Sequence, residues 1–459
     1  MAGVTATLEK KGIPSVCQIV DIPAIKQIAK LNYLVNGVPE ARSVFIPQNR
    51  FTEKWADEDL KVALDALTRP LTDAEKRSGK YKPAVAPRIA LTGTYDQVQE
   101  FFTGDLSAFV DRAPIARWTD GLPVTPPTQE AVARMLKGTS HRPDEIVHPG
   151  IGPQKRPVTV EKVAINAVMA GCKPEYLPIC LTMVETGLYT PWTSSGSMGI
   201  LHMVSGPMVK ELGMNAGTAF MHPGNPANET MGRFARLAIR NLLGIEHTVN
   251  LVQSYGTKLL GDILPESPDT PWEGLNVRYG YTAKDNVLLQ ITRYIALVGH
   301  STGEGTHIAE NLEAPGQLLK TVAMFQPSPA SQGRFIIITP EQARRWKTDY
   351  KWNTMQDLQE FLWKGNTWER RMYDTSYWWG SRLPFAEYVA ALKNPRGSMA
   401  LNPDHVDAPP TAQVPRAISP KDYPILVAGG GNPNYHVKQT SFSYGDFGAY
   451  SVWRIDKWK

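Results

Sequence analysis

The chain has 459 residues, of which 42% are hydrophobic and 20% are charged, and its formal net charge is +5. No run approaches the ~18 apolar residues of a membrane-spanning helix, and the first residues lack a signal peptide's apolar core. We therefore expect a soluble, cytoplasmic protein. The basic residues are scattered, which gives no indication of a nucleic-acid partner. Cys17, Cys172 and Cys180 have neither metal-ligand nor disulfide-framework spacing.

Residues 12–68 predict two strand–helix units. Residues 13–21 and 41–48 are rich in β-branched side chains, and helical apolar patterns follow them at 25–31 and 57–70. This alternation is typical of a small parallel α/β layer. Because a stable sheet usually needs three or more strands, we expect further strands from later in the chain or from another chain.

The next segments predict a change of architecture. Residues 72–87 are polar and lack periodicity, as a linker arm would, and residues 88–102 predict a strand, a turn and a helix. Thr128 is the expected N-cap of a helix that ends near Gly138. We divide the chain into a half domain (1–71), a linker arm and strand–helix connection (72–115), and a large domain (116–459).

The large domain is expected to mix helices and strands. Thr159 and Gly171 fit the two ends of one helix, and Pro174 fits the first turn of a second. Strand-like runs follow residue 275. The fold class is therefore a multidomain protein with an α/β layer and a large mixed α+β domain.

The stretch "FMHPGNPANETMGRFARLAIRNLLG" (220–244) predicts a helix with Asn225 as its N-cap and Pro226 in its first turn. Capping and packing explain most of it. The remaining polar side chains are expected to converge on the helix N-terminus, where a carboxylate or phosphate could bind. These candidates are His222, Asn215, Asn228 and Arg233, together with Asn225 itself.

Other candidate residues have a functional and a structural interpretation. Lys162 and Asn166 share a helix face, which either is solvated or lines a pocket. Cys172 lies between two helices beside Lys173, and is either a small buried residue or a reactive thiol. Residues 299–311 hold two histidines with nearby glutamates, a pattern that allows metal binding or acid–base catalysis at His307. The glycines at 429–431 favour a tight turn over a nucleotide loop, because no phosphate-binding pattern is present.

Five motifs, in order, resemble a bacterial family that is encoded with, or fused to, proteins of the UGSC type, named for a Sec/Cys-Gly-Ser-Cys motif. They are "RIALTGTYDQVQEFF", "WTDGLPVTPPT", "VTVEKVAINAVMAGCKPEYLP", "SGPMVKELGMNAG" and "HPGNPANETMGR". The likeness extends from about residue 88 to residue 431. The segments "EKKGIPSVCQIVD" and "ARSVFIPQNRF" resemble the second half of the UGSC domain itself.

The resemblance implies a split domain, because no Cys-Gly-Ser-Cys sequence occurs in this chain. A partner chain would then bring the Cys or Sec nucleophile. The resemblance also favours a pocket beside Lys162 and Asn166. It favours acid–base catalysis by His307, which matches a Glu-Gly-x-His element of the family.

The leading expectation is therefore a subunit of a heteromeric enzyme for a small anionic or carbonyl-containing metabolite. The chemistry would be redox or thiol addition. A metal-dependent hydratase or lyase is one alternative, and a non-catalytic binding or scaffolding subunit is another. The sequence names no cofactor.

Overall fold

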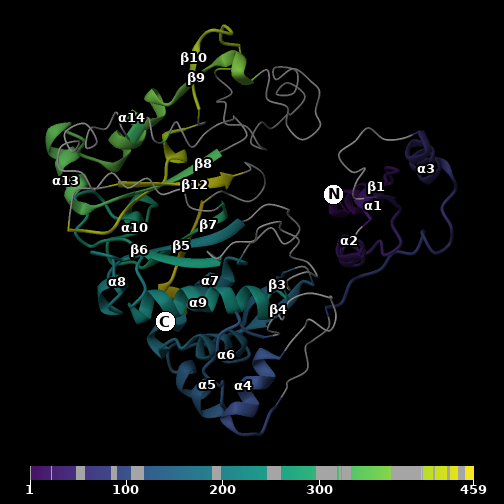
Figure 1. Cartoon of the computed structure of the whole chain (residues 1–459), viewed down its shortest axis with the longest axis horizontal. Helices are drawn as coiled ribbons and strands as arrows, with labels where there is room; N and C mark the ends of the chain where they lie inside the picture. Colours follow the sequence, from purple (N-terminus) through teal and green to yellow (C-terminus); the bar gives the residue numbers. More distant parts are fainter. Residues whose placement is uncertain are drawn as a thin grey trace.

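The chain divides into an N-terminal α/β layer and a larger body of mixed helices and strands, shown in Figure 1 from a computed structural model. The structure describes residues 2–21, 23–47, 57–83, 90–104, 118–152, 154–188, 198–244, 260–295, 318–319, 322, 332–373, 405, 407–416, 419–431, 435–442 and 450–459. This mixture confirms the expected α+β class.

The N-terminal layer has a two-stranded parallel sheet with helices around it. Strand β1 pairs with β2 in a register that runs from Cys17 opposite Ser43 to Val20 opposite Ile46. Its small core gathers Ala6, Cys17, Ile19, Ala29 and Tyr33. The elements are α1 (Ala2–Lys10), β1 (Cys17–Val20), α2 (Pro23–Val35), β2 (Ser43–Ile46) and α3 (Asp57–Thr68).

An ion-pair cluster fastens the polar segment after α3 to this layer. The Arg42 guanidinium donates to both carboxylate oxygens of Glu75, at 2.9 and 3.0 Å, and Arg69 donates to the same carboxylate at 2.8 Å. These two guanidinium groups hold the pKa of the Glu75 carboxyl well below its usual range. The expected linker arm is therefore anchored at Glu75 before it leaves the layer.

Helices form the lower layer of the body in Figure 1. Thr159 caps α6 by accepting from the Lys162 N–H, and Gly171 ends that helix in the left-handed region, as the sequence predicts. Residues 90–94 form no strand, and the helix after them starts with a Thr94 capping box. The elements of this layer are α4 (Tyr95–Thr103), α5 (Gln129–Leu136), β3 (Ile146–Ile151), β4 (Arg156–Thr159), α6 (Val160–Ala170), η3 (Pro174–Tyr176), α7 (Leu177–Glu185) and α9 (Pro226–Asn241).

One seven-stranded sheet crosses the body in the order β11-β8-β12-β7-β5-β6, with β13 also paired to β7. Strand β5 is parallel to β6, whereas β7 is antiparallel to β5 and to both β12 and β13. Strands β11, β8 and β12 form one half of the sheet and β7, β5, β6 and β13 form the other, and the two halves are joined where β12 pairs with β7 at Thr440 and Tyr294. Its strands are β5 (Met198–Ser205), β6 (Leu260–Pro265), β7 (Val287–Ile295), β8 (Gln332–Ile338), β11 (Ile425–Val427), β12 (Tyr435–Phe442) and β13 (Tyr450–Arg454).

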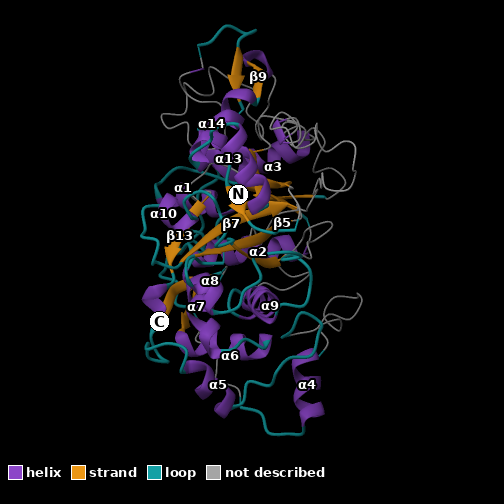
Figure 2. Ribbon diagram, turned by 90° about the vertical axis from the view of Figure 1, so that its left-hand side faces the viewer, coloured by secondary structure: helices purple, strands orange, loops and turns teal. Residues whose placement is uncertain are grey.

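Three apolar clusters hold the body together. The largest packs α5, α6, α7 and α9 against one face of β5 and β6, through residues such as Phe234, Leu237, Ile200 and Ile263. A second lies between the two halves of the sheet and includes Met203, Leu289, Phe335 and Ile337. The third seats α13 and α14 on β8 and β11 around Trp346. Figure 2 shows this layered order from the side.

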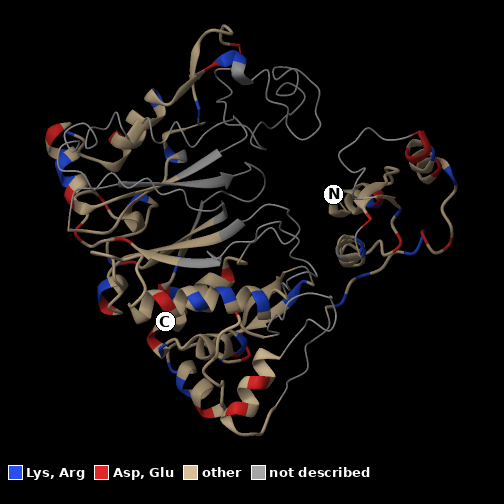
Figure 3. Cartoon of the chain, in the orientation of Figure 1, with Lys and Arg blue, Asp and Glu red and all other residues tan. Residues whose placement is uncertain are grey.

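Nine further elements complete the described helices and strands. They are α8 (Met208–Glu211), α10 (Leu275–Arg278), α13 (Pro340–Asp349), α14 (Met355–Gly365), β9 (Thr367–Glu369), η4 (Arg370–Tyr373), β10 (Gln413–Pro415), η7 (Pro420–Asp422) and η8 (Asp456–Trp458). Lys and Arg residues are interspersed with Asp and Glu residues along the elements of the body (Figure 3). Among the described residues, no helix is long and apolar enough to cross a membrane.

The last described residues are clamped against the loop after α5. Thr139 Oγ1 donates to the Trp458 carbonyl at 2.6 Å. The His141 ring makes two contacts, Nδ1 to Glu145 Oε1 at 2.8 Å and Nε2 to the Lys457 carbonyl at 2.6 Å. Both partners are acceptors, so both ring nitrogens can donate only when the imidazole is protonated.

We expect this clamp to weaken as pH rises. Burial lowers the pKa of His141, but the Glu145 carboxylate and the Lys457 carbonyl outweigh burial, so the pKa is raised above 6.5. A raised folded-state pKa gives stability that is complete below pH 6.5 and is lost as pH rises through the folded value. The difference in free energy of unfolding between the wild type and His141→Asn, measured in urea at several pH values, should therefore shrink with increasing pH. A difference in free energy of unfolding that grows with pH would contradict a role of the protonated imidazole in the clamp.

Candidate functional site

The predicted helix start at Asn225 is confirmed. Its Oδ1 accepts from the Asn228 N–H at 3.0 Å, Pro226 occupies the first turn of α9, and Gly224 has a φ of +135°. The Asn225 Nδ2 donates to the Gly213 carbonyl at 2.9 Å. The oxygen and the nitrogen of the Asn225 side-chain amide therefore both form hydrogen bonds with backbone groups, so the contacts of Asn225 are those of a helix cap.

Asn228 and Asn215 hold a loop in place. Asn228 is buried, its Oδ1 accepts from the Asn215 N–H at 3.2 Å, and its Nδ2 donates to the carbonyls of Asn215 and Phe220, at 2.9 and 3.3 Å. The Asn215 side chain closes a turn through Gly217 and Thr218. The side-chain amides of Asn228 and Asn215, which were expected to bind a ligand, are therefore hydrogen-bonded to backbone groups of the loop. Asn228 thus has a structural role at the helix start.

Arg233 does not join the other candidates, which corrects the expected convergence at the helix mouth. It is the eighth residue of α9, roughly 10 Å along the helix axis from its start. Its guanidinium pairs with Asp120 at 3.0 and 3.2 Å and donates to the carbonyls of Leu122 and Pro123. Arg233 therefore fastens the loop at 120–123 onto α9, because its long side chain crosses to that loop instead of turning back along the helix.

The remaining predicted residues lie apart from one another. His222 is exposed, and its Nδ1 lies 2.8 Å from the carbonyl oxygen of Pro223. Asn166 is buried between α6 and α9, where it donates to the Lys162 carbonyl and accepts from Asn241. Lys162 is half-buried, with its Nζ 3.5 Å from the Pro157 carbonyl. The shared face of Lys162 and Asn166 is thus partly a helix contact rather than a pocket wall.

The three cysteines are free and buried. Cys172 lies at the corner between α6 and η3 and neighbours Cys180, whose pKa is raised first by burial and then by Cys172. Among the described residues, no group of three or more His, Cys, Asp and Glu side chains could hold a metal. His307 lies outside the described residues, so its expected role stays a prediction.

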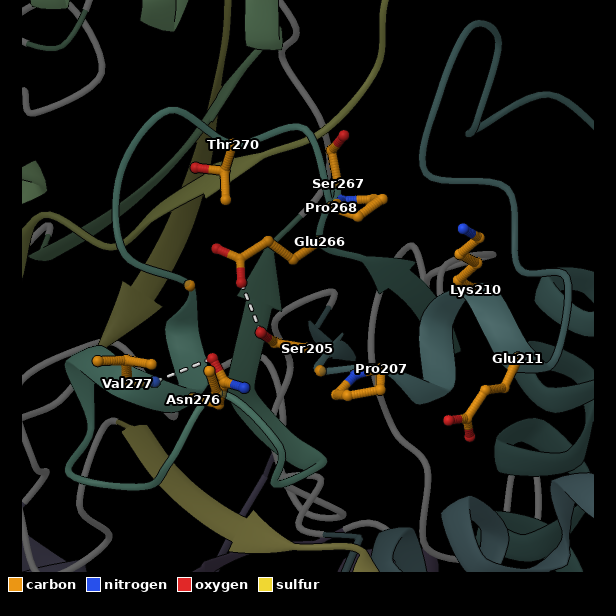
Figure 4. A pocket seen from close by; sticks show the side chains of 13 residues that line it. Ser205, Pro207, Lys210, Glu211, Glu266, Ser267, Pro268, Thr270, Asn276 and Val277 are labelled. Carbon is orange, nitrogen blue, oxygen red and sulfur yellow. Dashed lines mark hydrogen bonds between the residues drawn. The ribbon is translucent and has the colours of Figure 1, made fainter.

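A pocket of about 630 Å³ opens instead where β5 and β6 end (Figure 4). These strands are parallel neighbours, so their carboxyl ends meet at one edge of the sheet. Ser205 is the last residue of β5, and Glu266 follows the last residue of β6. Its wall consists of Ser205, Gly206, Pro207, Lys210, Glu211, Glu266, Ser267, Pro268, Thr270, Gly274, Asn276, Val277 and Ala283.

A hydrogen-bonded cluster around Glu266 forms the base of this pocket. The Ser205 hydroxyl lies 2.5 Å from Glu266 Oε2, which also accepts from the Leu275 N–H at 2.6 Å. Glu266 Oε1 accepts from Arg278 Nη2 at 2.8 Å, and Arg278 donates further to the Ile425 carbonyl. Glu266 is only 4% exposed, and its ion pair with Arg278 neutralises a carboxylate that burial would otherwise make costly.

Two glycines shape the pocket. Gly206 has a φ of +123°, and a Cβ there would lie 2.5 Å from the Asp285 carbonyl oxygen. A Cβ on Gly274 would lie 2.7 Å from Asn276 Oδ1, 3.4 Å from Glu266 Oε2 and 3.6 Å from Ser205 Oγ. The missing side chain of Gly274 therefore leaves space beside the Ser205–Glu266 pair, which is part of the pocket wall although both side chains are largely buried.

Gly274→Ala is expected to narrow the pocket without straining the backbone. The φ of −63° and ψ of 159° at Gly274 suit alanine, so the cost comes from crowding against Asn276, roughly 1–3 kcal/mol of the free energy of unfolding. Urea denaturation followed by circular dichroism would measure it. Gly79→Ala is the matched control, because no atom lies within 4 Å of its added Cβ. Equal stability of the wild type and Gly274→Ala would contradict the described wall.

The sequence carries a signal for this pocket that our sequence interpretation did not use. Two apolar runs each end in a polar residue followed by a Pro turn, as "LHMVSGP" (201–207) and "DILPESP" (262–268). Prolines stop strands, so such turns mark strand ends. Ser205 lies in a motif quoted for the family resemblance, but the strand pairing that brings it to Glu266 joins residues 61 positions apart.

Comparisons with protein-family models, with curated proteins and with solved structures found no match to this chain.

Proposed function

We propose that this chain is the small-molecule-binding subunit of a heteromeric enzyme whose partner chain completes the N-terminal layer. In this proposal the partner supplies a thiol or selenol nucleophile, and the pocket at Glu266 holds a small anionic or carbonyl-containing metabolite. The resemblance to the family of UGSC-associated proteins supports the identity of the nucleophile. The observation that carries the proposal is the uncovered apolar surface of the N-terminal layer.

This surface lies mainly on α3. The helix contains Leu60, Val62, Leu64 and Leu67, all of which are exposed, while only Ala63 of the helix is buried. Leu60, Leu64 and Leu67 lie three or four residues apart and so share one face of α3, and large apolar side chains gathered on a surface are typical of an interaction site. We define the apolar surface of α3 as Leu60, Leu64 and Leu67.

The sheet beneath this surface also has open edges. Within residues 2–21, 23–47 and 57–83, β1 pairs with β2 alone. Two strands are marginal as an independent sheet, and an unpaired parallel edge can accept another strand. A partner that adds strands and covers α3 would pair the open sheet edge and bury the apolar surface of α3.

The cysteines of this chain support an external nucleophile. All three are buried, and a reactive thiol needs partial exposure and a cationic surrounding that lowers its pKa. Burial raises the pKa of Cys180 instead. In thiol addition to a carbonyl-containing metabolite, the partner's thiolate would form a bond to the carbonyl carbon. The π bond of the C=O group would break, and its electron pair would move to the oxygen, which takes up a proton.

Purification of the chain from its native source, or co-expression with neighbouring genes, tests the partner. We expect a stable complex with a second chain, detected by size-exclusion chromatography with light scattering. Leu64→Asp should dissociate the complex, whereas Leu122→Asp, at an exposed leucine of the body, should leave it intact. An active, monodisperse homomer would overturn the proposal.

Alkylation of the complex tests the nucleophile. Iodoacetamide should abolish turnover by modifying the partner, while the three cysteines of this chain stay unmodified because they are buried. Mass spectrometry of both chains identifies the modified residue. Undiminished turnover with a fully alkylated partner would exclude a thiol mechanism and leave a binding role.

A further inference from the structure

The pocket at the ends of β5 and β6 differs chemically between its base and its rim. At the base, the Ser205 hydroxyl donates to Glu266, so the serine oxygen can act towards a ligand only as an acceptor. Glu266 is an acceptor in all three of its contacts. The base therefore offers acceptors, and it suits a ligand group that donates a hydrogen bond.

The net charge at the base of the pocket decides whether a ligand ammonium or a ligand hydroxyl would bind there. The Arg278 guanidinium lies 2.8 Å from Glu266 and is largely buried beside it, so the pair is neutral as a unit. An ammonium group placed there would be a second cation near Arg278. It would lose its hydration, and no unpaired carboxylate at the base would compensate its charge. A hydroxyl group donates the same hydrogen bond at no such cost. The base thus favours a hydroxyl over an amine.

The rim supplies a positive charge. Lys210 on α8 lines the pocket, is exposed and forms no ion pair among the described residues. Figure 4 shows its side chain extending upwards in the view, whereas the side chain of the neighbouring Glu211 points downwards. An anionic group at the rim would therefore meet an ammonium that no carboxylate of the described chain neutralises.

The rest of the wall suits a short aliphatic chain. Pro207, Pro268, Val277 and Ala283 contribute apolar surface to the wall. A cavity of about 630 Å³ lies within the range of small-molecule sites, about 300–1,000 Å³.

We propose that this pocket binds a small hydroxycarboxylate, with its hydroxyl on Ser205 and Glu266 and its carboxylate on Lys210. This assignment rests on the proposed function, because it names the substrate class of the same pocket. It adds an orientation, in which the carbon that bears the hydroxyl lies deepest, against Gly274.

Four six-carbon probes that differ by one group each test this assignment by isothermal titration against the full chain. They are 2-hydroxyhexanoate, 2-aminohexanoate, hexanoate and hexane-1,2-diol. We expect 2-hydroxyhexanoate to bind at least tenfold more tightly than each of the others, since loss of one charge-assisted contact costs about a factor of ten. Equal affinity for the amine would overturn the hydroxyl assignment, and equal affinity for the diol would overturn the carboxylate assignment.

Variants locate the binding. Lys210→Gln should weaken the affinity for 2-hydroxyhexanoate about tenfold, and Gly274→Ala should abolish its saturable binding. Lys284→Gln is the matched control, because Lys284 is an exposed lysine outside the pocket wall. Unchanged affinity in both pocket variants, or no saturable binding of 2-hydroxyhexanoate to the wild type, would overturn the proposal.

This test separates the two proposals. A chain that forms the expected heteromeric complex but binds none of the probes, alone or in the complex, refutes the ligand assignment only. A chain that binds 2-hydroxyhexanoate with the predicted variant pattern but never acquires a partner refutes the proposed function only.

Discussion

Replacing Glu266 with alanine is expected to lower the free energy of unfolding by about 3–5 kcal/mol, because it leaves the largely buried Arg278 without a counter-charge. The Ser205 hydroxyl and the Leu275 N–H would lose their acceptor at the same time. Urea denaturation monitored by tryptophan fluorescence would measure the loss. A decrease of less than 1 kcal/mol would show that the cluster is not held as described.

Two controls define the cause. The double variant Glu266→Leu with Arg278→Met removes both charges, so it should lose less stability than Glu266→Ala alone. Glu130→Ala breaks an exposed pair with Arg134 and should change stability by about 0.5 kcal/mol or less. A double variant as unstable as Glu266→Ala would assign the loss to packing instead of to the uncompensated charge.

Replacing Asn228 with alanine is the second change with a large expected effect. The Asn215 N–H and the Asn215 and Phe220 carbonyls would lose their partner, at about 1–3 kcal/mol for each buried group left unpaired. A thermal or urea transition of the purified variant measures this. If Asn228 served only a ligand, the variant would keep its stability and lose binding alone.

His222→Ala is the matched control for Asn228. His222 belongs to the same stretch, but it is exposed and contacts its own neighbour, Pro223. Its replacement should change the free energy of unfolding by less than about 0.5 kcal/mol. If His222 has a functional role as predicted, that role would appear in turnover of the complex and not in stability.

Local signals predicted the helices of the body well. Thr128, Thr159 and Asn225 each cap the helix expected from the sequence, because a cap is formed by the N-cap side chain and a backbone N–H three residues later. The parallel strands of the N-terminal layer were also predicted, since β-branched runs alternate there with amphipathic helices.

The strands that make the pocket were not predicted. Residues 198–205 and 260–265 become β5 and β6 by pairing with each other, and β5 also pairs with β7, which is far from it along the chain. Short apolar runs of this kind are ambiguous until a partner is known. The site could not be assembled from sequence alone, because that pairing brings Ser205 to Glu266.

Arg233 also shows that the sequence alone does not predict which polar groups meet. The sequence places it near a helix start with three other polar residues, which favoured a binding role. The structure gives its guanidinium to Asp120, 113 residues earlier, because α9 packs beside the loop at 120–123. A long side chain can reach several neighbours, and only the tertiary arrangement decides which of them it meets.

The sequence by itself determined the helix boundaries, the parallel strand–helix pattern of the first 68 residues and the shortage of strands in that layer. These properties depend on contacts within a few residues, on periodicity and on composition. The tertiary structure decided which polar groups meet: Asn228 with the 215–220 loop, Arg233 with Asp120, and Ser205 with Glu266. The physical reason is that hydrogen bonds between distant segments form only after the apolar faces of helices and strands have packed, and that packing fixes which segments become neighbours.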